Sequence, residues 1–224
     1  MDSGRTHVPI AIFRVLDTTN SAWPECAKIL LLVCAIPNLR STENGAGMEF
    51  PSLENRSWKR GQIDWTEQIV LVTGGSDGLG RVLVETFAQT HHCRCLDIKT
   101  YSDREEEEEG DLKFYRCDVS DPKAIEAVAE RIKEEVGSPT IIVNNAGIVH
   151  GKPILELDSA ELKSATFGVN VFAHFYIYKA FLPDMIKRNS GHIVTMASIL
   201  GHVGVSRVAD YCASKSAAIL LHQS

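Results

Sequence analysis

The sequence predicts an α/β fold in which a parallel β-sheet carries helices on both faces. Two observations predict it. The run from Ile69 to Val72 is rich in β-branched residues and lacks polar alternation, which is typical of a strand buried on both faces, and it leads directly into a glycine-rich turn. Beyond it, strand-like segments alternate with helical patterns through short loops, and this alternation implies a doubly wound sheet.

The expected elements follow one another along the chain from Glu67. Asp121 and Pro122 supply an N-cap and a proline at the first helical position, so a helix begins there. The strands are expected at residues 69–72, 94–98, 113–117, 141–143 and 192–196. The longer helices are expected at residues 79–89, 122–136 and 165–188.

Two acidic features lie between these elements. Asp158 and Glu161 have the spacing of a capping box, which opens another helix. The run of five glutamates at 105–109 predicts a solvated loop between the second and third strands.

The first 64 residues differ from the rest and are interpreted as an N-terminal extension and linker that precedes a single domain over residues 65–224. The run from Ile29 to Ile36 is apolar throughout, but a spanning helix needs about 20 apolar residues. A secretory signal is not expected, because no basic segment and cleavage site flank the run. A short helix that packs on the body or lies on a membrane surface stays open.

Composition limits the possible partners. The chain has 224 residues with 44% hydrophobic content, enough for one core and too little for two full α/β domains. A net charge of −6 without a basic stretch disfavours nucleic acid, because phosphate binding needs clustered Lys and Arg. The six cysteines form no C-x-x-C pair, so neither a metal site nor a disulfide framework is expected. A reduced intracellular compartment is expected instead.

The glycine-rich turn after the first strand predicts a dinucleotide site. Glycines let the backbone approach a pyrophosphate, and the following helix offers free N–H groups and a positive dipole end. The residues expected to contact the cofactor here are Gly74, Ser76, Asp77, Gly78, Leu79 and Gly80. Asp97, at the end of the next strand, can accept hydrogen bonds from the ribose hydroxyls and would repel a 2′-phosphate, so NAD is expected rather than NADP. A structural turn with an incidental aspartate is the alternative.

Tyr211 and Lys215 suggest acid–base chemistry, because residues four apart share one face of a helix. A phenol has a pKa near 10 and is a poor base at neutral pH. An ammonium held nearby lowers that pKa toward the working range. The spacing alone is common and also fits an ordinary helix surface. Ser198 favours a site, since it ends the fifth strand, and ligands bind at the carboxyl ends of parallel strands.

Taken together, these motifs resemble the classical short-chain dehydrogenases/reductases, whose domain is a Rossmann-type fold. The resemblance covers about Glu67 to Ser224. It rests on the turn at 73–80, Asp118, the Asn-Asn-Ala-Gly segment at 144–147, Asn170, Ser198, Tyr211 and Lys215.

The resemblance implies a role for each of these residues. Tyr211 would be the general acid/base and Ser198 would hydrogen-bond the substrate oxygen. Lys215 would hold the nicotinamide ribose and lower the tyrosine pKa, and Asn170 would anchor a water-mediated proton relay. Among the cofactor contacts, the resemblance adds Asp118 and Val119 beside the adenine and Asn145 along the cofactor site. Asn144 is expected to tie the fourth strand to its neighbours.

A narrower resemblance points to the retinol and 17-beta-hydroxysteroid dehydrogenase branch. It rests on the segment 201–205, on Asp210 before Tyr211, and on Trp65 before the first strand. It implies a lipophilic alcohol and its ketone or aldehyde as substrates, and a homodimer. It also implies a protein that is cytoplasmic or peripherally associated with endoplasmic reticulum or lipid-droplet membranes.

Compared with the family, the sequence stops within the helix that carries Tyr211, so we expect a fold that is incomplete at the C-terminus. The fifth strand, which leads to Ser198, is then expected at an exposed edge, with weak or absent activity. Three hypotheses stay open: an NAD-dependent oxidoreductase that interconverts an alcohol and its carbonyl, a truncated non-catalytic nucleotide-binding protein, and a gene-model fragment.

Overall fold

The computed structural model describes residues 67–88, 92–99, 106–109 and 111–224. The expected extension at 1–64, with its apolar run from Ile29 to Ile36, lies outside the described residues. The strands are β1 (Ile69–Thr73), β2 (His92–Asp97), β3 (Glu106–Glu109), β4 (Leu112–Arg116), β5 (Ile141–Asn144) and β6 (His192–Thr195). The helices are α2 (Gly78–Ala88), α3 (Pro122–Glu135), η3 (Ile154–Glu156), η4 (Glu161–Phe172), α4 (Ala173–Arg188), η5 (Ile199–Gly201) and α5 (Ala209–Gln223).

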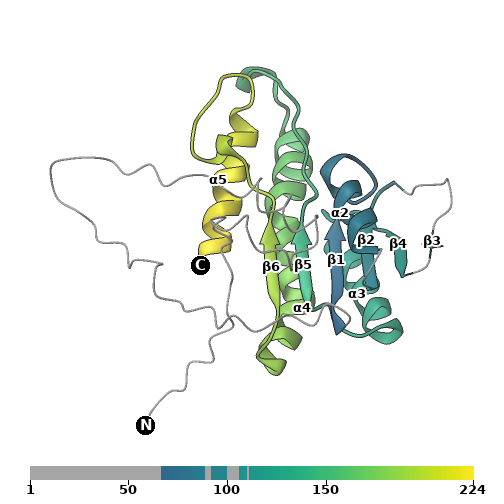
Figure 1. The fold of residues 1–224 in the computed structure, drawn as a ribbon. Helices are drawn as coiled ribbons and strands as arrows, with labels where there is room; N and C mark the ends of the chain where they lie inside the picture. The colour runs from purple at the N-terminus through teal and green to yellow at the C-terminus, as the bar shows by residue number, and fades with distance from the viewer. Residues whose placement is uncertain (1–66, 89–91, 100–105, 110) are drawn as a thin grey trace, which may run out of the picture.

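The strands form one sheet in the order β3-β4-β2-β1-β5-β6. Every pairing among β1, β2, β4, β5 and β6 is parallel, which confirms the expected doubly wound sheet. The carboxyl ends of β1 and β5 lie side by side, and the glycine-rich turn follows the first of them (Figure 1). β6 is the outer strand on its side of the described sheet.

The expectation of a loop at the five glutamates is wrong for four of them. Glu106–Glu109 form β3, which pairs antiparallel with β4 in the register Glu106 to Tyr115 and Glu109 to Leu112. An edge strand pairs on one side only, and charged residues are common on such edges because they discourage further pairing. Composition identified the charge but gave no sign of the partner strand.

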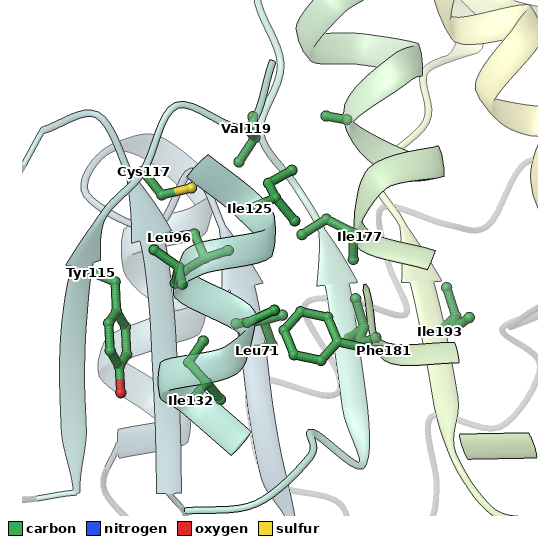
Figure 2. Packing of buried hydrophobic residues seen from close by; sticks show 14 of the residues in the cluster. Leu71, Leu96, Tyr115, Cys117, Val119, Ile125, Ile132, Ile177, Phe181 and Ile193 are labelled. Carbon is green, nitrogen blue, oxygen red and sulfur yellow. The ribbon is translucent and has the colours of Figure 1, made fainter. Parts of the chain in front are cut away.

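The two faces of the sheet bury separate cores, because side chains alternate along each strand. One core joins Val70, Val72, Cys93 and Cys95 to helix α2. The other joins the sheet to α3 and α4, and Figure 2 shows it around Leu71, Ile132 and Phe181. Helices therefore cover both faces, and the carboxyl edge of the sheet stays open to the loops.

The segment from Glu161 to Arg188 is one continuous helical run rather than two helices. Its first part, η4, is π-helical, and α4 follows without a break. The expected capping box is confirmed, since the Asp158 carboxylate accepts a hydrogen bond from Glu161 N at 2.8 Å and the Glu161 carboxylate accepts one from Asp158 N at 3.3 Å. The N-cap at Asp121 is also confirmed by its bond from Lys123 N at 2.9 Å.

Candidate active site

The glycine-rich turn is packed too closely for other side chains. A Cβ on Gly80 would lie 2.0 Å from the Gly74 carbonyl oxygen and 2.4 Å from Asn145 Nδ2, and one on Gly74 would lie 2.8 Å from Ala146 Cα. Gly74 also has a φ of 66°, which favours glycine. Asn145 Nδ2 donates to the carbonyls of Thr73 and Gly74, each at 2.9 Å. Asn145, on the loop after β5, therefore fixes the backbone of the glycine-rich turn through these two hydrogen bonds.

Asp97 is fixed at the end of β2 beside this turn. Its carboxylate accepts hydrogen bonds from Ser76 N at 2.9 Å and from Lys99 N at 3.0 Å. The Ser76 hydroxyl donates to the Lys99 carbonyl at 2.6 Å, which closes the arrangement. The carboxylate is half-buried, so its negative charge lies at the surface where the turn and the strand end meet.

The remaining cofactor candidates differ in what they expose. Asp77 is exposed and accepts from Gly78 N at 2.7 Å, and the Leu79 side chain is exposed in the first turn of α2. Asp118 is exposed and accepts from both the backbone N and the hydroxyl of Ser120, at 2.9 Å and 2.7 Å. Val119 differs, because its side chain is only 6% exposed and belongs to the core. It has little side-chain surface to offer a ligand.

Lys215 and Tyr211 lie one turn apart on α5, as the spacing predicted. Lys215 is buried, and its Nζ lies 5.7 Å from the centre of the Tyr211 ring, within the range of a cation–π contact. The same Nζ donates to the backbone carbonyl of Met196 at 2.7 Å. Gly147 is close as well, since a Cβ built on it would lie 3.3 Å from Lys215 Nζ. The ammonium thus connects α5, the end of β6 and the loop after β5.

Burial changes the pKa of the Lys215 amine. Desolvation lowers the pKa of Lys215 to about 8, because a charged amine loses the water that stabilises it. At neutral pH most of the amine is still protonated. Lys215 therefore supplies a positive charge beside the Tyr211 ring.

Both polar atoms of the Asn170 side chain have hydrogen-bond partners in the protein. Its Nδ2 donates to the Ile148 carbonyl and to Ser214 Oγ, each at 2.9 Å, and its Oδ1 accepts from Ile148 N at 2.8 Å. The Ser214 hydroxyl in turn donates to the Tyr211 carbonyl at 2.8 Å. Asn170 therefore ties the loop after β5 to α5. The water relay that the resemblance implies for it stays a prediction.

Ser198 lies two residues beyond Met196 and begins the short helix η5. Its hydroxyl oxygen accepts a hydrogen bond from Leu200 N at 3.2 Å, and the side chain is partly exposed. A hydroxyl that accepts from the backbone keeps its own proton available to a ligand. The candidate catalytic residues Asn170, Ser198, Tyr211 and Lys215 therefore belong to η4, the end of β6 and α5, which meet at one edge of the sheet.

Sequence reasoning missed a buried polar cluster next to Tyr211. The Thr166 hydroxyl lies 2.7 Å from Asp210 Oδ2, and His150 Nδ1 lies 3.1 Å from the same hydroxyl. Thr166 and Asp210 are completely or almost completely buried. The three residues come from a loop, η4 and α5, and their separate positions carry no local pattern that sequence reasoning can use. Ser214 was missed for the same reason.

Comparison with known proteins places the chain in a family. A profile described as short chain dehydrogenase matches residues 68–224. The chain belongs to the short-chain dehydrogenase/reductase family. It is 44% identical to human epidermal retinol dehydrogenase 2, in an alignment that covers 67% of this chain and 51% of that protein. It is 38% identical to human estradiol 17-beta-dehydrogenase 11, covering 71% of this chain and 55% of the relative.

Solved structures of the family have the same fold. A metagenomic short-chain oxidoreductase in complex with NADP matches with a TM-score of 0.64 and 30% identity, covering 70% of this chain and 74% of that one. A 4-hydroxyisoleucine dehydrogenase complexed with NADH matches with a TM-score of 0.62 and 29% identity, covering 69% and 66%. The Rossmann-type fold and the resemblance to the retinol and hydroxysteroid dehydrogenases are thereby confirmed.

The chain spans about half the length of the curated relatives that it matches. Within the part of the chain that the structure describes, no helix is both long and apolar enough to cross a bilayer. The same residues include no group of three or more His, Cys, Asp or Glu side chains placed to hold a metal ion.

Proposed function

We propose that the protein is an NAD-dependent oxidoreductase that interconverts a lipophilic alcohol and its ketone or aldehyde. The observation that carries the proposal is the placement of Lys215. Its ammonium is buried, bonded to the Met196 carbonyl, and 5.7 Å from the Tyr211 ring. Burying a cation beside a phenol destabilises the fold. Acid–base catalysis by that phenol would explain why the cation is placed there.

The residues present fit a dinucleotide. The turn at Gly74 and Gly80 has no room for a Cβ, and the first turn of α2 offers backbone N–H groups to a pyrophosphate. Asp97 would receive the ribose hydroxyls, with Asp118 and the backbone of Val119 at the adenine. A carboxylate at the ribose favours NAD over NADP, because a 2′-phosphate would meet like charge.

The residues of α5 and β6 would then handle the proton. Bound NAD supplies the hydride acceptor for the alcohol carbon. Tyr211 Oη takes the proton of the alcohol hydroxyl, and Ser198 Oγ donates a hydrogen bond to the same oxygen as it becomes a carbonyl. Lys215 holds positive charge near the phenol that receives this proton. In the reverse direction Tyr211 returns the proton to the oxygen.

Exposed apolar side chains on the two loops at this edge favour a lipophilic substrate. Val149, Ile154 and Leu155 follow β5, and their side chains are between about half and fully exposed. Ile199, Val203 and Val205 follow β6 and are about half exposed. Apolar surface that faces water at a site is typical of an apolar ligand. The names of the relatives, which include retinol and estradiol dehydrogenases, support the same class.

The test is NADH or NADPH formation, followed by fluorescence, with dodecanol and retinol as substrates and with NAD or NADP as cofactor. We expect faster turnover with NAD than with NADP. In Tyr211→Phe it should fall by a factor on the order of 10² to 10⁴, because the proton carrier is removed. Tyr176→Phe, on α4, is the matched control and should keep its activity. Binding of NADH without turnover of any alcohol would instead favour a non-catalytic nucleotide-binding protein.

We also propose a homodimer and a peripheral contact with endoplasmic reticulum or lipid-droplet membranes. The relatives' lipophilic substrates support a location near lipid. Carbonate washing of membranes should release the protein, and light scattering of the purified protein should give twice the chain mass. Retention in the pellet until detergent is added would contradict the peripheral contact.

A further inference from the structure

The cluster of His150, Thr166 and Asp210 has a fixed pattern of hydrogens. A carboxylate only accepts, so the single proton of the Thr166 hydroxyl points to Asp210 Oδ2, 2.7 Å away. The Thr166 oxygen is then an acceptor toward His150 Nδ1, 3.1 Å away, and that nitrogen must carry a hydrogen. In the neutral ring Nε2 is therefore left as an acceptor.

Burial decides which edge of the imidazole is available. The Asp210 side chain is 0% exposed, while the His150 side chain is 23% exposed. The Nδ1 edge faces the two buried partners, so the exposed part of the ring is on the opposite edge. The ring thus offers Nε2 to the surface, in an orientation fixed by the two buried partners.

The cluster lies against the proposed reaction site. Asp210 precedes Tyr211 on α5, and Thr166 is one turn before Asn170 on η4. A second buried bond, from Asn170 to Ser214, joins the same two helices one turn further along. His150 therefore sits on the loop after β5 at a position fixed relative to the tyrosine. The segment that follows β5 also carries the exposed apolar residues Val149, Ile154 and Leu155.

We propose that His150 is a specificity-determining residue that binds a second hydroxyl group of the substrate. A hydroxyl fits because it can donate a hydrogen bond to the Nε2 acceptor, which a carbonyl or an ether cannot do. The preferred substrate class is then a lipophilic alcohol that carries another hydroxyl away from the reacting carbon. This assignment rests on the proposed function. It adds a contact that distinguishes substrates with a second hydroxyl group from those without one.

The experiment measures binding rather than turnover. Protein loaded with NADH is titrated by calorimetry with dodecanol and with the dodecanediol that has a hydroxyl at each end, and then with shorter terminal diols and their matching alcohols. We expect one chain length at which the diol binds about two- to tenfold more tightly than the alcohol, the usual range for one hydrogen bond. His150→Leu should remove this preference.

Variants of the supporting residues and a neighbouring histidine make the test specific. Thr166→Val should reduce the preference, because it frees the ring, while Thr166→Ser keeps the hydroxyl and should retain it. His202→Leu, an exposed histidine on the loop after β6, should leave the preference unchanged. A preference absent from the unaltered protein, or kept in His150→Leu, would overturn the assignment. If dodecanol still reduces NAD in that case, the proposed function stands without it, and if neither alcohol binds or reacts, both fail.

Discussion

Lys215 donates a hydrogen bond to the backbone carbonyl of Met196 at 2.7 Å, and this bond joins the middle of α5 to the end of β6. No carboxylate among the described residues forms an ion pair with this buried ammonium. Among the described residues this ammonium therefore has no opposite charge beside it, and its carbonyl acceptor lies two residues before Ser198. Such a charge weakens the fold, and the cost can be measured.

We expect the buried ammonium to make stability depend on alkaline pH. Burial lowers the pKa of Lys215 from 10.5 to about 8, so the unfolded chain binds the proton more tightly than the folded one between these values. The destabilisation by this group is absent above pH 10.5. It grows as the pH falls toward 8, so the free energy of unfolding decreases over this range. From about pH 7 to about pH 9.5 the gain from this group is about 2 kcal/mol.

Lys215→Met isolates that contribution, because it keeps the length of the side chain and removes the charge. Urea unfolding followed by circular dichroism should show the variant more stable at neutral pH, with its advantage shrinking as the pH rises. Lys179→Met, at an exposed position on α4, is the control and should change little. An advantage that is the same at both pH values would contradict a depressed lysine pKa.

His174 predicts an opposite weakness in acid. It is 3% exposed on α4, and desolvation, helped by the nearby charges of Lys215 and His222, lowers its pKa from 6.5 to about 3. The folded protein keeps the ring neutral while the unfolded chain protonates, so stability is complete above pH 6.5 and is lost as the pH falls toward 3. The loss from about pH 7 to about pH 5 is about 2 kcal/mol.

His174→Leu should remove this part of the acid sensitivity, because leucine fills similar space without a titrating group. Urea unfolding at the two pH values measures it as a difference between the variant and the unaltered protein. Burial also lowers the pKa of His192, so some acid sensitivity should remain. The attribution to His174 fails if the variant loses as much stability in acid as the unaltered protein.

Asp97 is expected to set the preference between cofactors. Its carboxylate is held by Ser76 N and Lys99 N beside the turn. Ser76 N bonds to Oδ2 and Lys99 N bonds to Oδ1, so Asp97→Asn keeps an oxygen acceptor for one of these two bonds and removes the charge that opposes a 2′-phosphate. The affinity for NADP(H) relative to NAD(H), measured by fluorescence titration, should rise by about tenfold or more. Glu126→Gln makes the same charge change on the exposed face of α3 and should leave the ratio unchanged.

The sequence was most informative where function and backbone geometry depend on local patterns. The turn at 73–80 lies between a buried strand and a helix, and Tyr211 and Lys215 are one turn apart on a helix, so both patterns could be read without tertiary information. The capping box at Asp158 is local in the same way. These features were predicted because each depends on residues that are close in the sequence.

What escaped prediction depends on contacts between distant segments. β3 exists because Glu106–Glu109 pair with β4, and a run of glutamates carries no sign of that pairing. The cluster of His150, Thr166 and Asp210 joins residues separated by 16 and 44 positions, so no spacing rule identifies it. The burial of Val119, expected beside the adenine, also follows from how α3 packs on the sheet.

Gly80 gives a test of the turn itself. A Cβ there would lie 2.0 Å from the Gly74 carbonyl oxygen and 2.4 Å from Asn145 Nδ2. Asn145 Nδ2 donates a hydrogen bond to that carbonyl oxygen at 2.9 Å. Gly80→Ala must therefore push α2 away from the loop after β5 or break that bond. We expect a loss of stability of about 1 to 3 kcal/mol, as for other overpacked sites. NADH affinity, measured by calorimetry, should fall by about tenfold or more, because the pyrophosphate would meet a displaced backbone.

Two further glycines separate the effect of space from that of backbone conformation. Gly204 has no atom within 4 Å of a built Cβ and no left-handed backbone, so Gly204→Ala should change stability by less than about 0.5 kcal/mol. Gly78 also has open space but a φ of 54°, so Gly78→Ala should lose about 1 to 2 kcal/mol through backbone strain alone. If Gly80→Ala binds NADH as tightly as Gly204→Ala does, the close contact with Asn145 does not shape the cofactor site, and the turn owes its glycines to conformation rather than to packing.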